Sequence, residues 1–331
     1  MKSSDVRPLK ELAERASRDF PHIFAARERT STGLVDKRAS LEPLRHSPGA
    51  SIVLMGSWGR AEVTSGSDDD FMVLLRGAED LEVLPTIDEV SKVLDHSPSE
   101  DGPFASPVFS QKLVHQIGLD GDDNKNLTRR LLFLLESTPV TGEEVYGAVR
   151  DEILDRYMDG SVKPYRPPRF LLNDVVRYWR TICVDFAAKE WKGPEKWGIR
   201  NAKLRTSRKI LFAGGLLPVL ECSRFEVGPM RVFLEEERGR PPTDRIARAF
   251  LENDASDEGA RTLGAYDEFV GRMHQSDFRQ KLESLTRDTA KASAAFAEVE
   301  QIGKEIQAGL LALLHEASPQ LAKVVRDYAI F

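Results

Sequence analysis

The sequence predicts an α+β fold in which a small α/β domain is followed by a larger α-helical domain. Two short apolar runs, Ser51–Gly56 (SIVLMG) and Phe71–Leu75 (FMVLL), have the length and composition of buried strands, and Val108–Phe109 begins a third, weaker one. From Asn124 onward the apolar residues recur at helical spacing instead. This change of period along the chain predicts the two parts.

The boundary between the two parts is expected in Gly160–Pro168, a segment that contains three prolines. We therefore predict one domain over residues 1–160 and an α-helical domain over residues 161–331, each long enough to bury its own core. Helices are expected over 4–28, with Ser3, Ser4 or Asp5 as the N-cap, and over 85–96, Asn126–Ser137, Phe170–Lys189, Gly198–Ala213 and, as several packed helices, 241–331.

The composition narrows the class of protein. Of the 331 residues, 41% are hydrophobic and 30% are charged, which is typical of a soluble globular chain. No run of eighteen apolar residues occurs, and the N-terminus lacks the apolar core of a signal peptide, so we expect no membrane partner. Two cysteines, Cys183 and Cys222, are too few for a disulfide scaffold or a zinc site, which favours a reducing cytoplasm.

The charge is distributed unevenly. The net charge of −6 argues against a dedicated binder of long nucleic acid, because such proteins are usually basic. Residues 161–213 nevertheless contain thirteen Lys or Arg against four Asp or Glu. This block could therefore face a polyanion.

The most informative stretch is Gly56–Leu75, with the sequence GSWGRAEVTSGSDDDFMVLL. A strand that ends at Gly56 and Ser57 is expected to turn into a short helix, and the N–H groups of such a turn attract phosphate. The chain then returns as an adjacent strand that carries Asp68 and Asp70. Residues two apart in a strand point to the same face, so both carboxylates could hold Mg²⁺ or Mn²⁺. A phosphate-binding turn beside such a metal suits nucleotidyl transfer.

This stretch resembles the polymerase-β-like nucleotidyltransferase superfamily, whose signature is a strand, Gly-Ser, a spacer and Asp-x-Asp within a strand. The forms GRAE, ending in Glu62, and SDDD, beginning at Ser67, look especially similar to bacterial protein uridylyltransferases and adenylyltransferases, and Leu134–Gly142 (LLESTPVTG) extends the likeness weakly. The resemblance implies a polymerase-β-like domain with Asp68 and Asp70 as catalytic metal ligands. It also implies triphosphate contacts at Gly56 and Ser57.

The sequence departs from the superfamily pattern in two respects. The residue between the aspartates is usually apolar, whereas here it is Asp69, which should point to the opposite face and need a partner or solvent there. The superfamily usually has a third carboxylate on a later strand, which helps to hold the metal and deprotonates the acceptor. The candidates for it, none in a convincing strand, are Asp101, Asp120, Asp122 and Asp123.

Several other residues are candidates for nucleotide binding. Arg60 either reaches the nucleotide or pairs with Glu62 or the strand, and Ser67 either touches phosphate or shapes the turn. Arg200 and Lys203 share one face of a predicted helix. The resemblance implies a cation from a helical domain on the triphosphate, while the alternative is a solvated basic face.

Aromatic residues and histidines in the chain receive a structural interpretation first. Tyr178 or Trp179 could stack on a base, although a tryptophan in a helix more often belongs to the core. The six histidines are scattered without the spacing of metal ligands, so we treat them as structural or surface residues. A P-loop motif is also lacking, which argues against a P-loop ATPase.

The expected activity is metal-dependent, template-independent transfer of NMP or dNMP from a nucleoside triphosphate, such as ATP, to a hydroxyl, with release of pyrophosphate. The acceptor stays open between a protein hydroxyl and a nucleotide or oligonucleotide, the latter as in bacterial defence against phage. Tyr328, close to the C-terminus, could be a self-modified acceptor or primer, or could pack the last helix together with Ile330 and Phe331. A catalytically degenerate, nucleotide-binding regulator is the non-enzymatic alternative.

Overall fold

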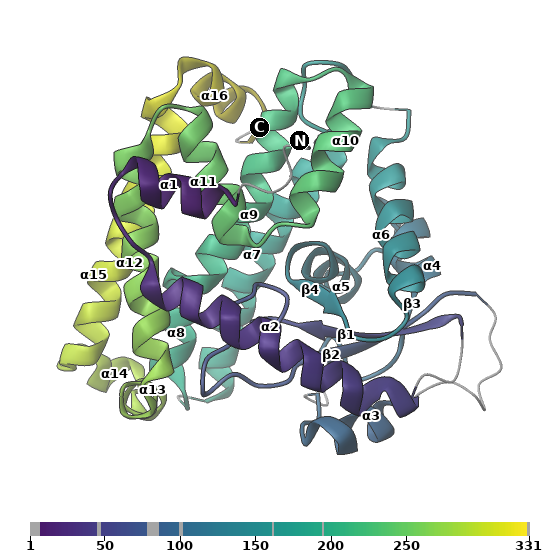
Figure 1. Cartoon of the computed structure of the whole chain (residues 1–331), viewed down its shortest axis with the longest axis horizontal. Coiled ribbons are helices and arrows are strands. Elements are labelled where there is room, and N and C mark those ends of the chain that lie inside the picture. The colour runs from purple at the N-terminus through teal and green to yellow at the C-terminus, as the bar shows by residue number, and fades with distance from the viewer. Residues whose placement is uncertain are drawn as a thin grey trace. The chain divides into compact units, whose positions relative to one another are not determined.

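The structure is a computed structural model that describes residues 7–44, 48–77, 86–98, 102–160, 162–193 and 195–329. Within these ranges the chain is mostly helical and forms a small mixed sheet of four strands (Figure 1). None of the described helices is both long enough and apolar enough to cross a lipid bilayer.

Contacts divide the chain into two compact units. The sheet unit contains Arg27–Val63 and Ser67–Val162, and the helical unit contains the chain up to Ala26, Thr64–Gly66 and Lys163–Phe331. The N-terminal segment thus groups with the helical unit, whereas the sequence placed all of residues 1–160 in one domain. The physical reason is the packing of the first helix on later helices of the same unit.

The sheet has the strand order β3-β2-β1-β4. β1 (Ala50–Met55) pairs antiparallel with both β2 (Phe71–Leu75) and β4 (Ser137–Pro139), while β3 (Val108–Phe109) runs parallel to β2. The three predicted strands are confirmed. The fourth contradicts the prediction of continuous helix after Asn124, because a strand of three residues is too short to show a period of its own.

The core of the sheet unit forms around the two central strands. Every residue of β1 and β2 is buried, as their unbroken apolar runs predict. Helices of this unit are α2 (Pro21–Leu41, which starts in the helical unit), the 3₁₀ turn η1 (Glu42–Leu44), α3 (Ile87–Leu94), α4 (Ser110–His115), α5 (Asn124–Leu135) and α6 (Glu143–Met158).

The predicted helix over 4–28 is wrong as a single element. The chain forms α1 (Pro8–Arg15), turns at Ser17, and starts α2 at Pro21. Pro21 has no N–H to continue a helix and its ring excludes the preceding turn. The described chain begins at Arg7, which is the N-cap of α1, so the predicted caps Ser3, Ser4 and Asp5 lie outside the described residues.

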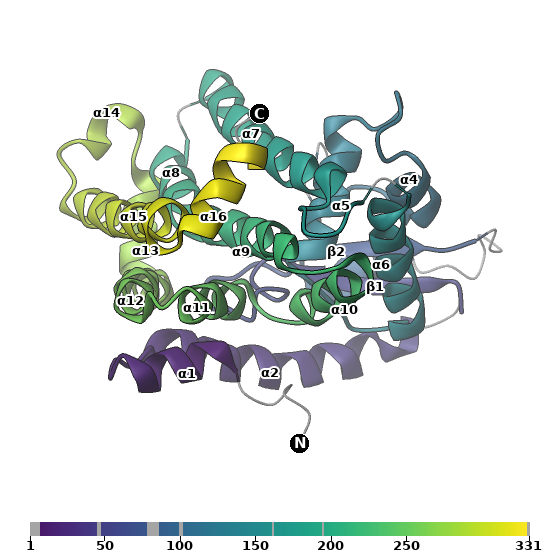
Figure 2. The same ribbon diagram turned by 90° about the horizontal axis from the view of Figure 1, so that it is seen from above.

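The helical unit is a stack of helices. In Figure 2, α1 lies against α11 and α12, and these pack in turn on α9 and α15. Its later elements are α7 (Arg169–Lys192), α8 (Trp197–Arg205), α9 (Ser207–Glu221), η3 (Cys222–Arg224), α10 (Val227–Arg238), α11 (Pro242–Glu252), α12 (Ser256–His274), α13 (Ser276–Ser284), α14 (Arg287–Ala290), α15 (Ala294–Ala312), η4 (Leu313–Ala317), α16 (Pro319–Val324) and η5 (Val325–Ala329).

Two predicted helices end differently in the structure. The helix expected over Gly198–Ala213 is broken at Thr206, whose backbone (φ −122°, ψ −93°) is not helical and separates α8 from α9. The helix expected to end at Ser137 ends at Leu135, because Ser137 belongs to β4. Cys183 and Cys222 are both free thiols.

Candidate functional site

Gly56 and the aspartates that precede β2 lie at one edge of the sheet. β1 and β2 are antiparallel with Leu54 opposite Phe71, and the Met55 N–H donates to the Asp70 carbonyl over 2.8 Å. The end of β1 and the start of β2 therefore meet. The turn after β1 and the aspartates before β2 lie on neighbouring segments because of this register.

Gly56 adopts the left-handed conformation at φ 65° that starts the turn. A Cβ built on Gly56 would stand 3.6 Å from Oδ2 of Asp70, so the Asp70 carboxylate lies directly beside this glycine. The helix predicted after Ser57 is wrong: residues 56–61 form turns, held by bonds from the Arg60 N–H to the Gly56 carbonyl and from the Glu62 N–H to the Ser57 carbonyl. The turn is too short for a regular helix.

Gly59 explains why this turn lies close to the neighbouring strand β4. A Cβ at Gly59 would come within 2.0 Å of the Glu136 carbonyl carbon and 2.3 Å of the Ser137 nitrogen. Only glycine allows the turn to rest on this peptide.

The three consecutive aspartates differ in their surroundings. Asp69 accepts a hydrogen bond from Trp58 Nε1 over 2.9 Å and forms an ion pair with Lys37, which supplies the partner that its side of the strand required. Asp68 and Asp70 are exposed. Among the described residues neither of them makes an ion pair with Lys or Arg. The side chains of the three aspartates thus point alternately to the two faces, as predicted for an extended chain. The three residues precede β2, however, and do not lie inside it.

His96, which follows α3, lies next to the aspartates. Its Nε2 is 3.5 Å from Oδ1 of Asp70. The sequence did not indicate this residue, because an isolated histidine after a helix carries no spacing signal. Its position depends on how α3 packs against β1 and β2.

The donors at this edge fit a hard divalent cation. Asp68 and Asp70 present carboxylate oxygens from a backbone that is anchored to β1, and no described Lys or Arg neutralises them. Asp69, which is neutralised, lies between them. These two residues are the ones that would hold Mg²⁺ or Mn²⁺.

Arg60 is held inside a buried ion-pair network. Its Nε donates to Glu62 over 2.9 Å and its Nη1 pairs with Glu136, and both carboxylates are almost fully buried. Arg60 thus connects the turn to the residue before β4. Of the two alternatives that the sequence left open for Arg60, this is the ion-pairing one and not the nucleotide contact. Ser67 is half-buried and precedes the aspartates directly.

Among the described candidates for a third carboxylate, two have other partners and one is exposed. Asp122 is buried and binds Arg130 through both oxygens, at 2.8 and 2.7 Å. Burial alone would raise the pKa of Asp122, but the hydrogen bonds and charge of Arg130 lower it below its usual value. Asp123 caps α5 through the Asn126 N–H, Asp120 is exposed in the turn after α4, and Asp101 lies outside the described residues.

β3 does not supply the missing ligand in the described chain. It pairs with Leu74 and Leu75, at the opposite end of β2 from Asp70, through Val108 and Phe109. Neither of these two residues is acidic. Asp68 and Asp70 are the candidate carboxylates that the register of β1 and β2 places at this edge.

The cationic candidates belong to the helical unit. Arg200, on α8, donates Nη2 to the backbone carbonyl of Glu195 and, at 3.4 Å, to that of Gly193. Lys203 is half-buried one turn further along α8. Ser207 falls on the next helix, although its hydroxyl still reaches the Lys203 carbonyl at 3.4 Å.

The two stacking candidates on α7 differ in exposure, because Tyr178 is buried and Trp179 is half-buried. Tyr178 is 1% exposed and belongs to the core. Trp179 stacks on Phe212 with ring centroids 5.0 Å apart. Tyr178 therefore offers no open stacking surface to a base.

Tyr328 lies in η5 and its ring contacts another element. The Arg169 guanidinium at the start of α7 stands 5.8 Å from the ring centroid, and the side chain is half-buried. This contact favours the packing role of Tyr328. Ile330 and Phe331, expected to pack beside it, lie outside the described residues.

Comparison of the chain with models of known protein families finds no match. Comparison with curated proteins finds no match either.

Proposed function

We propose that this protein is a metal-dependent nucleotidyltransferase that transfers NMP or dNMP from a nucleoside triphosphate to a hydroxyl and releases pyrophosphate. One observation carries the proposal: Asp68 and Asp70 meet the Gly56–Ser57 turn at one sheet edge, exposed and without a Lys or Arg partner among the described residues. A polymerase-β-like fold for the sheet unit is part of the same proposal.

Each part of this edge has a role in such a reaction. Asp68 and Asp70 would hold the metal, which when bound would stabilise negative charge on the phosphate oxygens. The N–H groups of the turn after Gly56 would bind the outer phosphates. Arg60, through Glu62 and Glu136, keeps the turn in place. Arg200 and Lys203 remain proposed triphosphate contacts from the helical unit.

A second candidate function has an observation in its favour. Asp122 and Asp123, which could have completed the metal site, are engaged with Arg130 and with the start of α5. A site with only two carboxylates would still bind nucleotide but would lack a base for the acceptor. The alternative is therefore a catalytically degenerate regulator that binds nucleotide without turning it over.

The acceptor is proposed only as a hydroxyl. A protein side chain agrees with the sequence resemblance to protein uridylyltransferases and adenylyltransferases. A nucleotide or oligonucleotide acceptor would instead place the protein among oligonucleotide-synthesising enzymes of defence against phage, with Tyr328 as the proposed protein primer. A cytoplasmic location is proposed on the same grounds as in the sequence analysis.

The decisive experiment incubates the protein with each labelled NTP and dNTP in the presence of Mg²⁺ or Mn²⁺. Pyrophosphate release is measured, and products are sorted into protein-bound and free. Release that requires Asp68 and Asp70, and that survives Asp88→Asn on the exposed first turn of α3, supports the enzyme. Nucleotide binding without release supports the regulator, and neither binding nor release would overturn both.

Intact-mass measurement after the same incubation tests Tyr328. A mass gain of one or more nucleotides that disappears in Tyr328→Phe supports self-modification. Free product beside an unmodified protein assigns Tyr328 to packing against Arg169 alone.

A further inference from the structure

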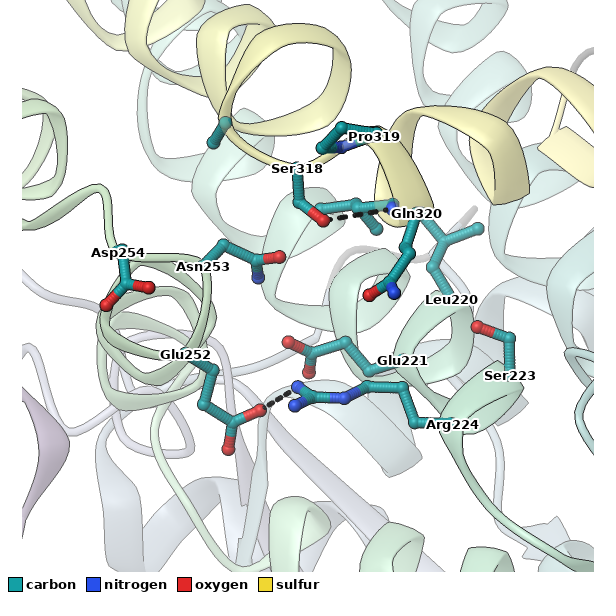
Figure 3. A pocket seen from close by; sticks show the side chains of 12 residues that line it. Leu220, Glu221, Ser223, Arg224, Glu252, Asn253, Asp254, Ser318, Pro319 and Gln320 are labelled. Atoms are coloured by element: carbon teal, nitrogen blue, oxygen red, sulfur yellow. Dashed lines mark hydrogen bonds and ion pairs between the residues drawn. The ribbon is translucent and has the colours of Figure 1, made fainter.

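The helical unit contains a pocket of about 260 Å³ that the proposed reaction does not use. Three chain segments form it: the end of α9 with η3, the end of α11, and the turn between η4 and α16 (Figure 3). The side chains that matter below are those of Glu221, Arg224, Glu252, Asn253, Asp254 and Gln320.

Glu221 is the unusual member of the pocket wall. It is 3% exposed, and its Oε2 pairs with Arg248 behind the wall. Its other oxygen, Oε1, is buried without a hydrogen-bond partner. Figure 3 shows this carboxylate pointing into the space between Asn253 and Gln320. A buried carboxylate oxygen without a donor is costly, so the site calls for a donor that the chain does not supply.

The charge of the pocket favours a cation. Its wall carries three carboxylates, Glu221, Glu252 and Asp254, against the guanidinium of Arg224, and Arg248 behind the wall pairs with both glutamates. Arg224 is already paired with Glu252, whereas Asp254 makes no ion pair among the described residues. The C-terminal ends of α9 and α11 add the negative ends of two helix dipoles, while the start of the short helix α16 adds one positive end.

We propose that this pocket binds a small organic cation, an ammonium or guanidinium group that donates to Oε1 of Glu221. Such groups carry three to five N–H donors and no acceptor, which complements a wall rich in oxygen atoms. Asn253 donates its amide to the Ala249 carbonyl over 2.8 Å, which leaves its side-chain oxygen as a further acceptor. Gln320 contributes an amide from the exposed rim.

The size of the pocket admits an organic cation of several heavy atoms. About 260 Å³ is several times the roughly 30 Å³ that one water molecule occupies in the liquid, so the ligand has several heavy atoms. The same chemistry could come from a free amine or from a Lys or Arg side chain of another protein. The inference is independent of the proposed nucleotidyl transfer, since all of its residues lie in the helical unit.

The test is calorimetric titration of the full chain at fixed ionic strength with agmatine, with spermidine, and with a blocked Gly-Arg-Gly peptide. We expect saturable binding of at least one of them. Binding of the free amines assigns a small-molecule cation, and binding of the peptide alone assigns a protein side chain. The proposal would be overturned if none of the probes bound saturably. It would also be overturned if MgCl₂ competed with the probes for the pocket.

Two variants examine the pocket itself. Glu221→Gln should weaken binding about ten- to a hundredfold, the worth of a hydrogen bond to a charged group. Gln320→Lys, which places a cation on the exposed rim, should weaken binding without disturbing the buried pairs and stays informative if Glu221→Gln fails to fold. Gln307→Lys, the same change on the exposed face of α15, is the matched control. Unchanged affinity in Gln320→Lys would contradict the proposal.

Discussion

Asp68 and Asp70 at the sheet edge, and Glu221 and Glu237 in the helical unit, are both clusters of acidic side chains, but their surroundings are opposite. The two aspartates are exposed, and among the described residues no Lys or Arg pairs with them. The two glutamates are buried and share Arg248, which also binds Glu252 over 2.6 Å.

The difference separates carboxylates whose charge is compensated inside the fold from carboxylates whose charge is not compensated by a described Lys or Arg. A buried carboxylate needs a counter-charge, and Arg248 supplies it to the glutamates. An exposed carboxylate needs none, so its position on a rigid edge beside a turn is what suggests chemistry. Both situations occur within one tripeptide. Asp69 is bound by Lys37 and Trp58, whereas its two neighbours are exposed and have no Lys or Arg partner among the described residues.

Removing the carboxylates of Asp68 and Asp70 should have the largest effect on activity. We expect Asp68→Ala with Asp70→Ala to lower pyrophosphate release at least about a thousandfold, since a metal supplies several kcal/mol of charge stabilisation and each 1.4 kcal/mol is tenfold. The melting temperature should hardly change, because both side chains are exposed. Normal turnover in the double variant would refute the proposed site. Asp69→Asn should instead lower the melting temperature.

Breaking a buried pair should have the largest effect on stability. Asp122→Asn leaves Arg130, which is fully buried, without its carboxylate and should cost about 3–5 kcal/mol in denaturant unfolding. Because the folded pKa of Asp122 is lowered, this stabilisation is present above its unfolded pKa and is lost as the pH falls through the folded value. Asp120→Asn, at an exposed position, is the control. Loss of activity at full stability would make Asp122 a catalytic residue.

The next largest effect is expected from substitutions of the basic residues of α8. Lys203→Ala or Arg200→Ala should weaken triphosphate binding about ten- to a hundredfold, which corresponds to roughly 1.5–3 kcal/mol for one charge-assisted contact. Nucleotide affinity is measured directly by calorimetry. Unchanged affinity in both variants would assign Arg200 to its bonds with the carbonyls of Gly193 and Glu195.

The pH dependence of Glu221 should give the smallest effect. Burial, opposed by Arg248, raises the pKa of Glu221 from 4.5 to about 7. The folded state therefore binds this proton more tightly than the unfolded state does. The stability that results is present below pH 4.5 and is lost as the pH rises to about 7. When the pH is raised from 5 to 8, the free energy of unfolding of Glu221→Gln should therefore increase by roughly 2 kcal/mol relative to that of the original chain. An equal difference in unfolding free energy at both pH values would contradict this.

Local patterns predicted the parts of the site that are contiguous in the chain. The apolar runs predicted β1, β2 and β3, and the spacing of two predicted that Asp69 would face away from Asp68 and Asp70. The same patterns failed where structure depends on short or interrupted segments. Thr206 ends α8, Pro21 restarts the chain as α2, and β4 spans only three residues.

The sequence by itself determined the strands, the helical second half and the order of glycine, serine and aspartates, because these depend on local period and turn chemistry. Only the tertiary structure decided which charges meet. His96 reaches Asp70, Arg60 reaches Glu136, and Glu221 on α9 shares Arg248 on α11 with Glu237 on α10. These pairings join residues far apart in the chain, and their partners are selected by packing and by the cost of burying an unpaired charge.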